Sequence, residues 1–217
     1  MLGTLCSHYP RQYIGTDVNE NNEGCYESLG DFYRNKIDSE NEYLMFNKRA
    51  EMIHTVPEFM GYKGKIDLII TSPPYFDKEL YSESIRQSSK RYGDFNSWKT
   101  MFLHPTLETC FKYLSTNSYM IWNISDIKRG ENDYIPLEQH TVELATMMGF
   151  DYIGKIGMVM SRMVGLDTSS IQNSWFDEST KMDYKIEPCF VFYKGFMSEL
   201  KKDPIHNKRL HKIPMGM

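Results

Sequence analysis

"IDLIITSPPYFD", residues 66–77, joins a near-continuous apolar run to a corner that contains two prolines and an aromatic ring. Such a run is typical of a β-strand that is buried on both faces of a parallel sheet. Proline has no N–H to donate to a sheet, so the strand should end at Thr71 and Ser72. The sequence therefore predicts a buried strand that leads into a rigid loop, formed by Pro73 and Pro74, with Tyr75 at its tip.

Strand-like and helix-like segments alternate on both sides of this corner. Strands separated by helices indicate a parallel sheet with helices on both faces, and hence an α/β fold. We expect residues 1–195 to form one domain and residues 196–217 to form a basic tail. The expected strands are residues 12–17, 42–47, 65–72, 118–125, 152–162 and 186–194, and the expected longer helices are residues 26–37, 95–114 and 137–148.

The pairing of these strands follows from what lies between them. Strands 65–72 and 118–125 should be adjacent and parallel, because a helix connects them. The first two strands should lie toward one side of the same sheet. The last two have little helix between them, so they should pair antiparallel. In such sheets ligands bind beyond the carboxyl ends of the strands, where Asp17, Ser72 and Asp126 are expected.

The composition excludes several classes of protein. The chain has 217 residues, of which 41% are hydrophobic, so it can bury a core, yet it has no apolar run long enough to cross a membrane. Its four cysteines are scattered, which argues against a zinc site or a disulfide framework and favours a reducing, cytoplasmic location. A net charge of −4 argues against a nonspecific DNA coat but allows a local basic face. We therefore expect neither a membrane segment nor a metal.

The corner has the groups needed to activate an aromatic amine. A nucleobase amine is a poor nucleophile because its lone pair is delocalised into the ring. The hydroxyl of Ser72 and the carbonyl of Pro73 could accept its two protons and turn the lone pair toward an electrophile. Tyr75 would stack on a base that has been flipped out of the duplex, for which the ring is needed and the hydroxyl is not.

"TSPPY" after a buried strand resembles motif IV of the S-adenosyl-L-methionine (SAM)-dependent DNA methyltransferases that modify exocyclic amines. "YIGTDVN" resembles their motif II, which implies that Asp17 holds the ribose hydroxyls of SAM. "FNKRAEM" lies where motif III falls, which implies that Glu51 is near the adenine of the cofactor. "SYMIWNISD" and "SRMVG…KIEPCFVF" are similar to the following strand and the closing hairpin.

The resemblance implies a Rossmann-like class I sheet, mostly parallel with a C-terminal antiparallel hairpin. One part of the family pattern is missing, since no first strand and no glycine-rich motif I precede "MLGTLC", which resembles the helix that follows that turn. The turn normally holds the carboxylate of the cofactor. We therefore expect weak binding of SAM by this chain, and a separate N-terminal segment is one candidate source of motif I.

The predicted reaction is transfer of a methyl group from SAM to an exocyclic amine of a flipped DNA base, with cytosine N4 slightly favoured over adenine N6. The alternatives are an RNA or protein-amide methyltransferase and a catalytically inactive DNA-binding fragment. Phe76, Lys78 and Arg162 are predicted to contact DNA, and the basic, aromatic segment 75–95 is a candidate DNA-facing loop.

Each of these residues also has a purely structural interpretation. The corner could only terminate a strand, with Tyr75 covering the core. Asp17 could cap the following helix, and Glu51 could be an acid favoured at a helix start. Asn123 is expected to hydrogen-bond at the end of its strand. Cys189 lies in an apolar run, where thiols are usually inert, so we exclude a role as nucleophile.

Overall fold

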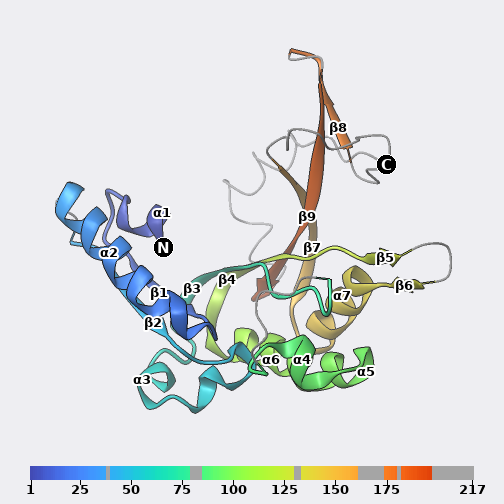
Figure 1. Cartoon of the computed structure of the whole chain (residues 1–217), viewed down its shortest axis with the longest axis horizontal. Helices are drawn as coiled ribbons and strands as arrows, with labels where there is room; N and C mark the ends of the chain where they lie inside the picture. The colour runs from blue at the N-terminus through green and yellow to red at the C-terminus, as the bar shows by residue number, and fades with distance from the viewer. Residues whose placement is uncertain (38–39, 79–84, 130–132, 161–173, 180–181, 197–217) are drawn as a thin grey trace. The chain divides into compact units, whose positions relative to one another are not determined.

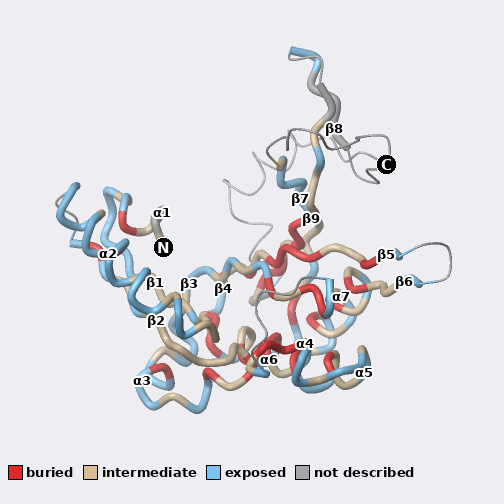
Figure 2. Tube along the Cα trace, viewed as in Figure 1, coloured by how far each residue is buried: buried red, intermediate tan, exposed pale blue. Residues whose placement is uncertain are grey.

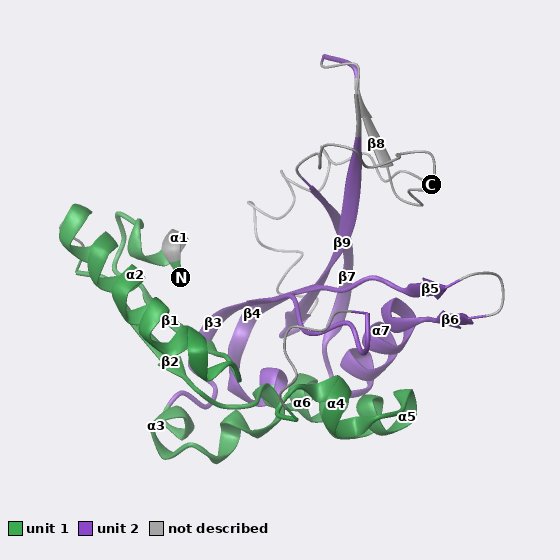
Figure 3. Cartoon of the chain, viewed as in Figure 1, with its two compact units in different colours: residues 1–61, 80–109 green, residues 62–79, 110–217 purple. Residues whose placement is uncertain are grey.

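The chain divides into two compact units, residues 1–61 with 80–109 and residues 62–79 with 110–217 (Figure 3). The structure is a computed structural model that describes residues 1–37, 40–78, 85–129, 133–160, 174–179 and 182–196. The predicted domain 1–195 stays a prediction, and nearly all of the predicted tail 196–217 lies outside the described residues.

The first unit begins with a strand–helix–strand element. After α1 (Leu2–Leu5), the strands β1 (Gln12–Thr16) and β2 (Glu42–Phe46) pair in parallel, and η1 (Glu20–Asn22) and α2 (Glu23–Ile37) connect them (Figure 1). A Cβ at Gly30 would lie 2.2 Å from the Tyr43 ring, so only glycine allows this approach of α2 to β2.

The expected position of β1 and β2 in the central sheet is wrong. Among the described residues they form a two-stranded sheet of their own, with Gln12 opposite Glu42 and Thr16 opposite Phe46. Propensity and spacing specify each strand and its parallel partner, but they do not specify which further strand completes the sheet.

The rest of the first unit is helical. It contains η2 (Ala50–Thr55), α3 (Pro57–Met60), α4 (Ser88–Tyr92), α5 (Phe95–Trp98) and the π-helical η3 (Lys99–Leu103), which continues into α6 (His104–Tyr113). The predicted helix 95–114 is thus present with a π turn inside it. Its N-cap is Asp94, whose side chain accepts from the Ser97 N–H at 3.0 Å.

The second unit is built on a five-stranded mixed sheet with β3 (Ile66–Thr71), β4 (Leu114–Asn123), β9 (Met182–Lys194) and β7 (Asp151–Val159) in that order. β8 (Ser174–Asp177) pairs antiparallel with residues 182–185, the first residues of β9. β5 (Ile127–Arg129) and β6 (Asp133–Ile135) form a small hairpin, and α7 (Leu137–Met147) follows them (Figure 1).

Two predictions about this sheet are confirmed. β3 and β4 are adjacent and parallel, with Thr71 opposite Trp122, and β7 and β9 form the C-terminal antiparallel pair. β9 lies between β4 and β7, so the antiparallel pair of β7 and β9 continues the sheet on the β4 side of the parallel pair of β3 and β4. Buried residues concentrate in α6, α7, β4 and the inner part of β9 (Figure 2).

The expectation that β3 is buried on both faces is wrong. Leu68 is 50% exposed and Ile70 is 68% exposed, although both are apolar and both point to one face of the strand. The reason is that β3 stands at the edge of the described sheet and has one hydrogen-bonded neighbour there, β4.

Candidate active site

The proline corner is placed by the parallel pairing of β3 and β4. Both strands end at the same edge of the sheet. Thr71 is opposite Trp122, so the next residues along the two chains, Ser72 and Asn123, start from neighbouring positions. Ser72 is exposed, Pro73 is buried and Pro74 is half-buried. The strand therefore ends where the prolines require, with one hydroxyl open to solvent.

Tyr75 is held in the core of the second unit by its hydroxyl. The ring is 4% exposed, and the hydroxyl donates to Oδ1 of Asn123 at 2.9 Å. Asn123 is also buried, and its Nδ2 donates to the carbonyl of Pro188 in β9 at 3.0 Å. Asn123 thus has the role within the sheet end that its position suggested, and it fixes the orientation of the tyrosine. Stacking of Tyr75 on a base stays a prediction.

The residues after Tyr75 continue this rigid arrangement. Phe76 is 6% exposed and has a φ of +48°, a conformation that bulky residues rarely adopt. Such strain persists only where the surroundings enforce it, and it is concentrated at functional sites. Asp77 accepts a hydrogen bond from Arg129 in β5, and the Nζ of Lys78 lies 5.2 Å from the centroid of the Tyr75 ring. The sequence did not indicate a role for Arg129, because its partner Asp77 lies 52 positions away along the chain.

Asp17 lies at the carboxyl end of β1 and is surrounded by donors from the first unit. Its Oδ1 accepts from the Asn19 N–H at 2.8 Å, and its Oδ2 accepts from Asn22 Nδ2 at 2.9 Å and from the Tyr26 hydroxyl at 2.6 Å. Burial acts to raise the pKa of Asp17, but these hydrogen bonds outweigh it and the pKa is lowered. Burial and the bond to Asp17 raise the pKa of Tyr26 to about 12.

Asp17 also lines a small, shallow pocket that opens to solvent. The pocket lies at the carboxyl ends of β1 and β2, where ligands bind in such sheets, and its wall also includes the first turn of α2. Its walls combine two carboxylates, two amides and a phenol with two apolar side chains. The lining residues are Asp17, Asn19, Glu23, Tyr26, Met45, Phe46 and Asn47.

A single arginine connects the two loops of this pocket. Arg86 donates through Nη1 to Oε1 of Glu20, which belongs to η1 after β1. Through Nη2 it donates to the side-chain oxygen of Asn47 and, at 3.3 Å, to the backbone carbonyl of the same residue after β2. Arg86 comes from the segment that was expected to face DNA, and the structure instead gives it these contacts within the first unit.

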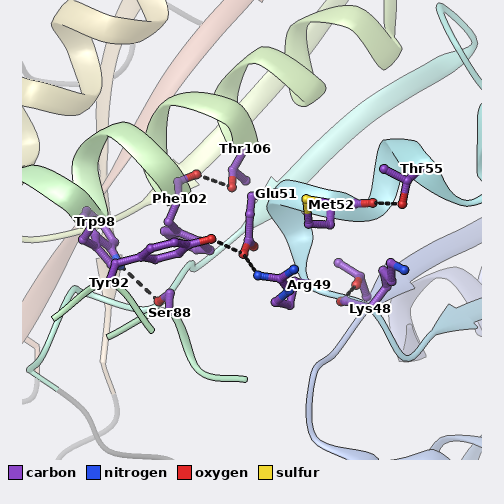
Figure 4. Close-up of polar contacts among 11 residues, drawn as sticks. Lys48, Arg49, Glu51, Met52, Thr55, Ser88, Tyr92, Trp98, Phe102 and Thr106 are labelled. Carbon is purple, nitrogen blue, oxygen red and sulfur yellow. Dashed lines mark hydrogen bonds and ion pairs between the residues drawn. The ribbon is translucent and has the colours of Figure 1, made fainter. Parts of the chain in front are cut away.

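Glu51 is buried among other groups of the first unit (Figure 4). Its side chain is 4% exposed, and its Oε1 accepts from the Tyr92 hydroxyl at 2.9 Å and from Nη1 of Arg49 at 3.3 Å. Burial and the bond to Glu51 raise the pKa of Tyr92. The seven residues that line the pocket do not include Glu51. Its contact with a cofactor stays a prediction, and the structure shows its role in joining η2 to α4.

The predicted site residues thus fall into two sets. Ser72, Pro73, Pro74 and Tyr75, with Phe76 and Lys78, belong to the second unit, whereas Asp17 and Glu51 belong to the first. Arg162 lies outside the described residues.

Cys189 does not have the properties of a nucleophile. It is 7% exposed in β9 and its pKa is raised by burial, the opposite of what an activated thiol needs. Within the described ranges, His, Cys, Asp and Glu side chains form no group of three that could hold a metal. In the same part of the chain, every helix is too short or too polar to cross a membrane.

Neither a family model nor a curated protein sequence matches this chain. Among solved structures, a protein from Thermus thermophilus named as a candidate DNA modification methylase aligns with a TM-score of 0.44 and 13% identity, over 94% of this chain and 63% of its own length. A structure of the same protein in complex with S-adenosyl-L-methionine gives a TM-score of 0.43 and 14% identity, over 94% of this chain and 66% of its own. A SAM-dependent methyltransferase from Methanosarcina mazei gives a TM-score of 0.46 and 10% identity, over 85% of this chain and 82% of its own length. The chain therefore spans less than two thirds of the length of the first of these proteins.

Proposed function

We propose that this chain is the core of a methyltransferase that transfers a methyl group from SAM to an exocyclic amine of a flipped DNA base, with cytosine N4 slightly favoured over adenine N6. The observation that carries the proposal is the corner at the end of β3, where Tyr75 is clamped by Asn123 and Ser72 is left exposed. A corner that served only to end a strand would not require a buried hydrogen bond that fixes the ring of Tyr75.

The residues of the corner perform the activation of the amine. Ser72 Oγ and the Pro73 carbonyl accept the two N–H protons, which localises the lone pair on nitrogen and directs it away from the ring. The two prolines fix the direction of the carbonyl before the substrate binds, so little ordering remains for the reaction itself. The cofactor supplies a sulfonium-activated methyl group. The proton that leaves the nitrogen passes to water or to Ser72.

We propose that the carboxyl ends of β1 and β2 in the first unit hold the adenosine half of the cofactor. Asp17 keeps an ionised carboxylate at the carboxyl end of β1, and we propose that a ribose hydroxyl donates to it. Met45 and Phe46 provide apolar wall for a purine. Glu51 is buried beside Arg49 and Tyr92, and we propose that it supports this end of the cofactor site by holding η2 in place.

The methionine half requires backbone N–H groups of the kind that a glycine-rich turn supplies. We propose that an N-terminal segment with one strand and such a turn provides them, and that its strand pairs with the edge of β3. The exposure of Leu68 and Ile70 supports this, because a paired and covered strand would shield both apolar side chains.

DNA is the proposed partner, and we propose that Lys78 contacts it. Lys78 is exposed and follows the corner by three residues, so its ammonium can reach a phosphate near a flipped base. Phe76 is buried, and we propose that it shapes the wall of the base site. Arg162 is proposed as a second phosphate contact.

The test is methyl transfer from radiolabelled SAM to unmethylated DNA, with mass spectrometry of the modified nucleosides. The full chain is assayed alone and with an added N-terminal strand and glycine-rich turn. We expect weak or no transfer by the chain alone and N4-methylcytosine or N6-methyladenine with the extension. Methylation of RNA or of protein amides in the same assay, with DNA unmodified, would contradict the DNA assignment. Absence of transfer to every substrate, with DNA still bound, would favour an inactive DNA-binding fragment.

A further inference from the structure

The chain leaves the proline corner through a tight turn. The Lys78 N–H donates to the carbonyl of Tyr75 at 3.0 Å, so Phe76 and Asp77 are the two central residues of this turn. Phe76, the first of them, has a φ of +48°, and turns with a positive φ at this position are usually built from glycine, asparagine or aspartate. A phenylalanine therefore keeps this conformation only because contacts outside the turn hold it there.

The turn fixes two features of the corner. It binds the backbone carbonyl of Tyr75, whose hydroxyl is held separately by Asn123 at 2.9 Å, so the tyrosine is anchored at both ends. It also brings Lys78 back over its own starting point, which places Nζ of Lys78 5.2 Å from the centroid of the Tyr75 ring. Opening of the turn would release the carbonyl and the ammonium together.

Asp77 connects the turn to the hairpin of β5 and β6. Its Oδ1 accepts from Nη2 of Arg129 in β5, and Nη1 of the same guanidinium lies 3.7 Å from Oδ2 of Asp133 in β6. Arg129 and Asp133 are directly opposite each other in the hairpin. The planar fork of arginine suits this bridging position, because its two Nη atoms can face two carboxylates at once.

This ion pair is poorly placed to stabilise the fold. The side chains of Arg129 and Asp77 are 43% and 39% exposed, and exposed ion pairs contribute little to folding and are screened by salt. The burial of the Phe76 ring holds the first central residue of the turn, and Arg129 holds the second. The consequence of the pair is therefore expected in the geometry of the turn, with little change in global stability.

Resting on the proposed function, we infer that Arg129 is a positioning residue for the corner. It holds Asp77, which keeps the turn closed and keeps the Tyr75 backbone and Lys78 where a flipped base and its phosphate need them. Arg129 acts through Asp77 and not on the substrate. Its loss should thus reduce the fraction of chains with a reactive corner, and kcat should fall while the KM for DNA changes by less than twofold.

The first measurement needs no methyl transfer and uses the full chain. NMR follows exchange with water of the Lys78 amide hydrogen, which is the donor that closes the turn. In Arg129→Met, which keeps an unbranched stem but has no donors, this exchange should be about twofold to fivefold faster, as loss of an exposed ion pair implies. Arg129→Lys should restore part of the protection. Lys128→Met, at the exposed neighbouring position of β5, removes the same charge and should leave the exchange unchanged.

The second measurement is methyl transfer to DNA by the same variants with the N-terminal extension of the assay above. We expect kcat to fall about twofold to fivefold in Arg129→Met, to recover in part in Arg129→Lys, and to stay unchanged in Lys128→Met. The melting temperature of all three should match that of the unaltered protein.

Each contrary outcome has its own meaning. Unchanged exchange of the Lys78 amide in Arg129→Met would overturn the inference, since the turn would then close without Arg129. Faster exchange with unchanged kcat would also overturn it, because the contact would be structural only. A raised KM with unchanged kcat would instead make Arg129 a direct contact to DNA. Absence of methyl transfer by the unaltered extended chain would overturn the proposed function, and the role of Arg129 in it, whatever the exchange rates.

Discussion

Replacing Tyr75 with Phe tests whether the hydroxyl clamps the corner. The change removes one oxygen and leaves Oδ1 of Asn123 buried without its donor, because Asn123 is 6% exposed and its Nδ2 is bound to Pro188. A buried polar group that loses its partner costs about 1–3 kcal/mol of folding free energy. For a chain of this size that corresponds to a fall in melting temperature of roughly 2–4 °C per kcal/mol.

The measurement is urea unfolding of Tyr75→Phe, Asn123→Ala and the double variant. If the two side chains interact, the double variant should be less destabilised than the sum of the singles, by about 0.5–1.5 kcal/mol. Tyr152→Phe is the matched control, since Tyr152 lies in the same unit and its hydroxyl has no hydrogen bond among the described residues. That variant should change stability by less than about 0.5 kcal/mol.

Two results would refute the reasoning. One is a Tyr75→Phe protein as stable as the Tyr152→Phe protein, and the other is strict additivity of the two single changes. Either would mean that the hydroxyl of Tyr75 is not held by Asn123.

Further predictions concern the first unit. Gly30→Ala should destabilise the protein by about 1–3 kcal/mol in urea unfolding, since the new Cβ would lie 2.2 Å from the Tyr43 ring. Gly24 lies in the same helix and has nothing within 4 Å of the position of a Cβ, so Gly24→Ala should be neutral or stabilising by up to about 1 kcal/mol. Equal effects of the two changes would contradict the packing of α2 on β2. Because the pKa of Asp17 is lowered by folding, its contribution to stability is present above the unfolded value of 3.8 and is lost as the pH falls through the folded value. Asp17→Asn should therefore be less stable than the unaltered protein at neutral pH, and the two should converge in acid; a constant difference across the titration would argue against the hydrogen-bonded carboxylate. Tyr92→Phe should lower stability by about 1–3 kcal/mol by removing a donor from buried Glu51, whereas full stability would show that Arg49 alone suffices.

The apolar run 66–71 and the prolines after it were enough to predict the end of β3. The segments between the strands predicted the parallel pairing of β3 with β4 and the antiparallel pair of β7 and β9. These features depend on local composition and on the lengths of connections, which are visible in a single sequence. The separate pairing of β1 with β2 was not visible, because it depends on which strands meet in space.

The contacts that build the candidate site were the least predictable. Tyr75 and Asn123 are 48 positions apart, and Arg86 and Asn47 are 39 apart, so neither pair leaves a periodic or local signal. Arg86 was instead grouped with its basic neighbours in the segment 75–95. Its role in the pocket follows only from the loops that η1 and β2 bring to it.

The claim that the corner activates an amine is tested most directly by removing the one exposed acceptor, the hydroxyl of Ser72. The assay is methyl transfer to DNA by the chain with the added N-terminal strand and glycine-rich turn, compared for Ser72→Ala and Ser125→Ala, where Ser125 follows the neighbouring strand β4. We predict that Ser72→Ala lowers the rate at least tenfold, because an acceptor aimed at the reacting group is typically worth about a hundredfold or more, while melting temperature and nucleoside binding are unchanged. Ser125→Ala should retain full activity. Equal rates for the two variants would contradict the account, since the corner would then end a strand without holding the amine.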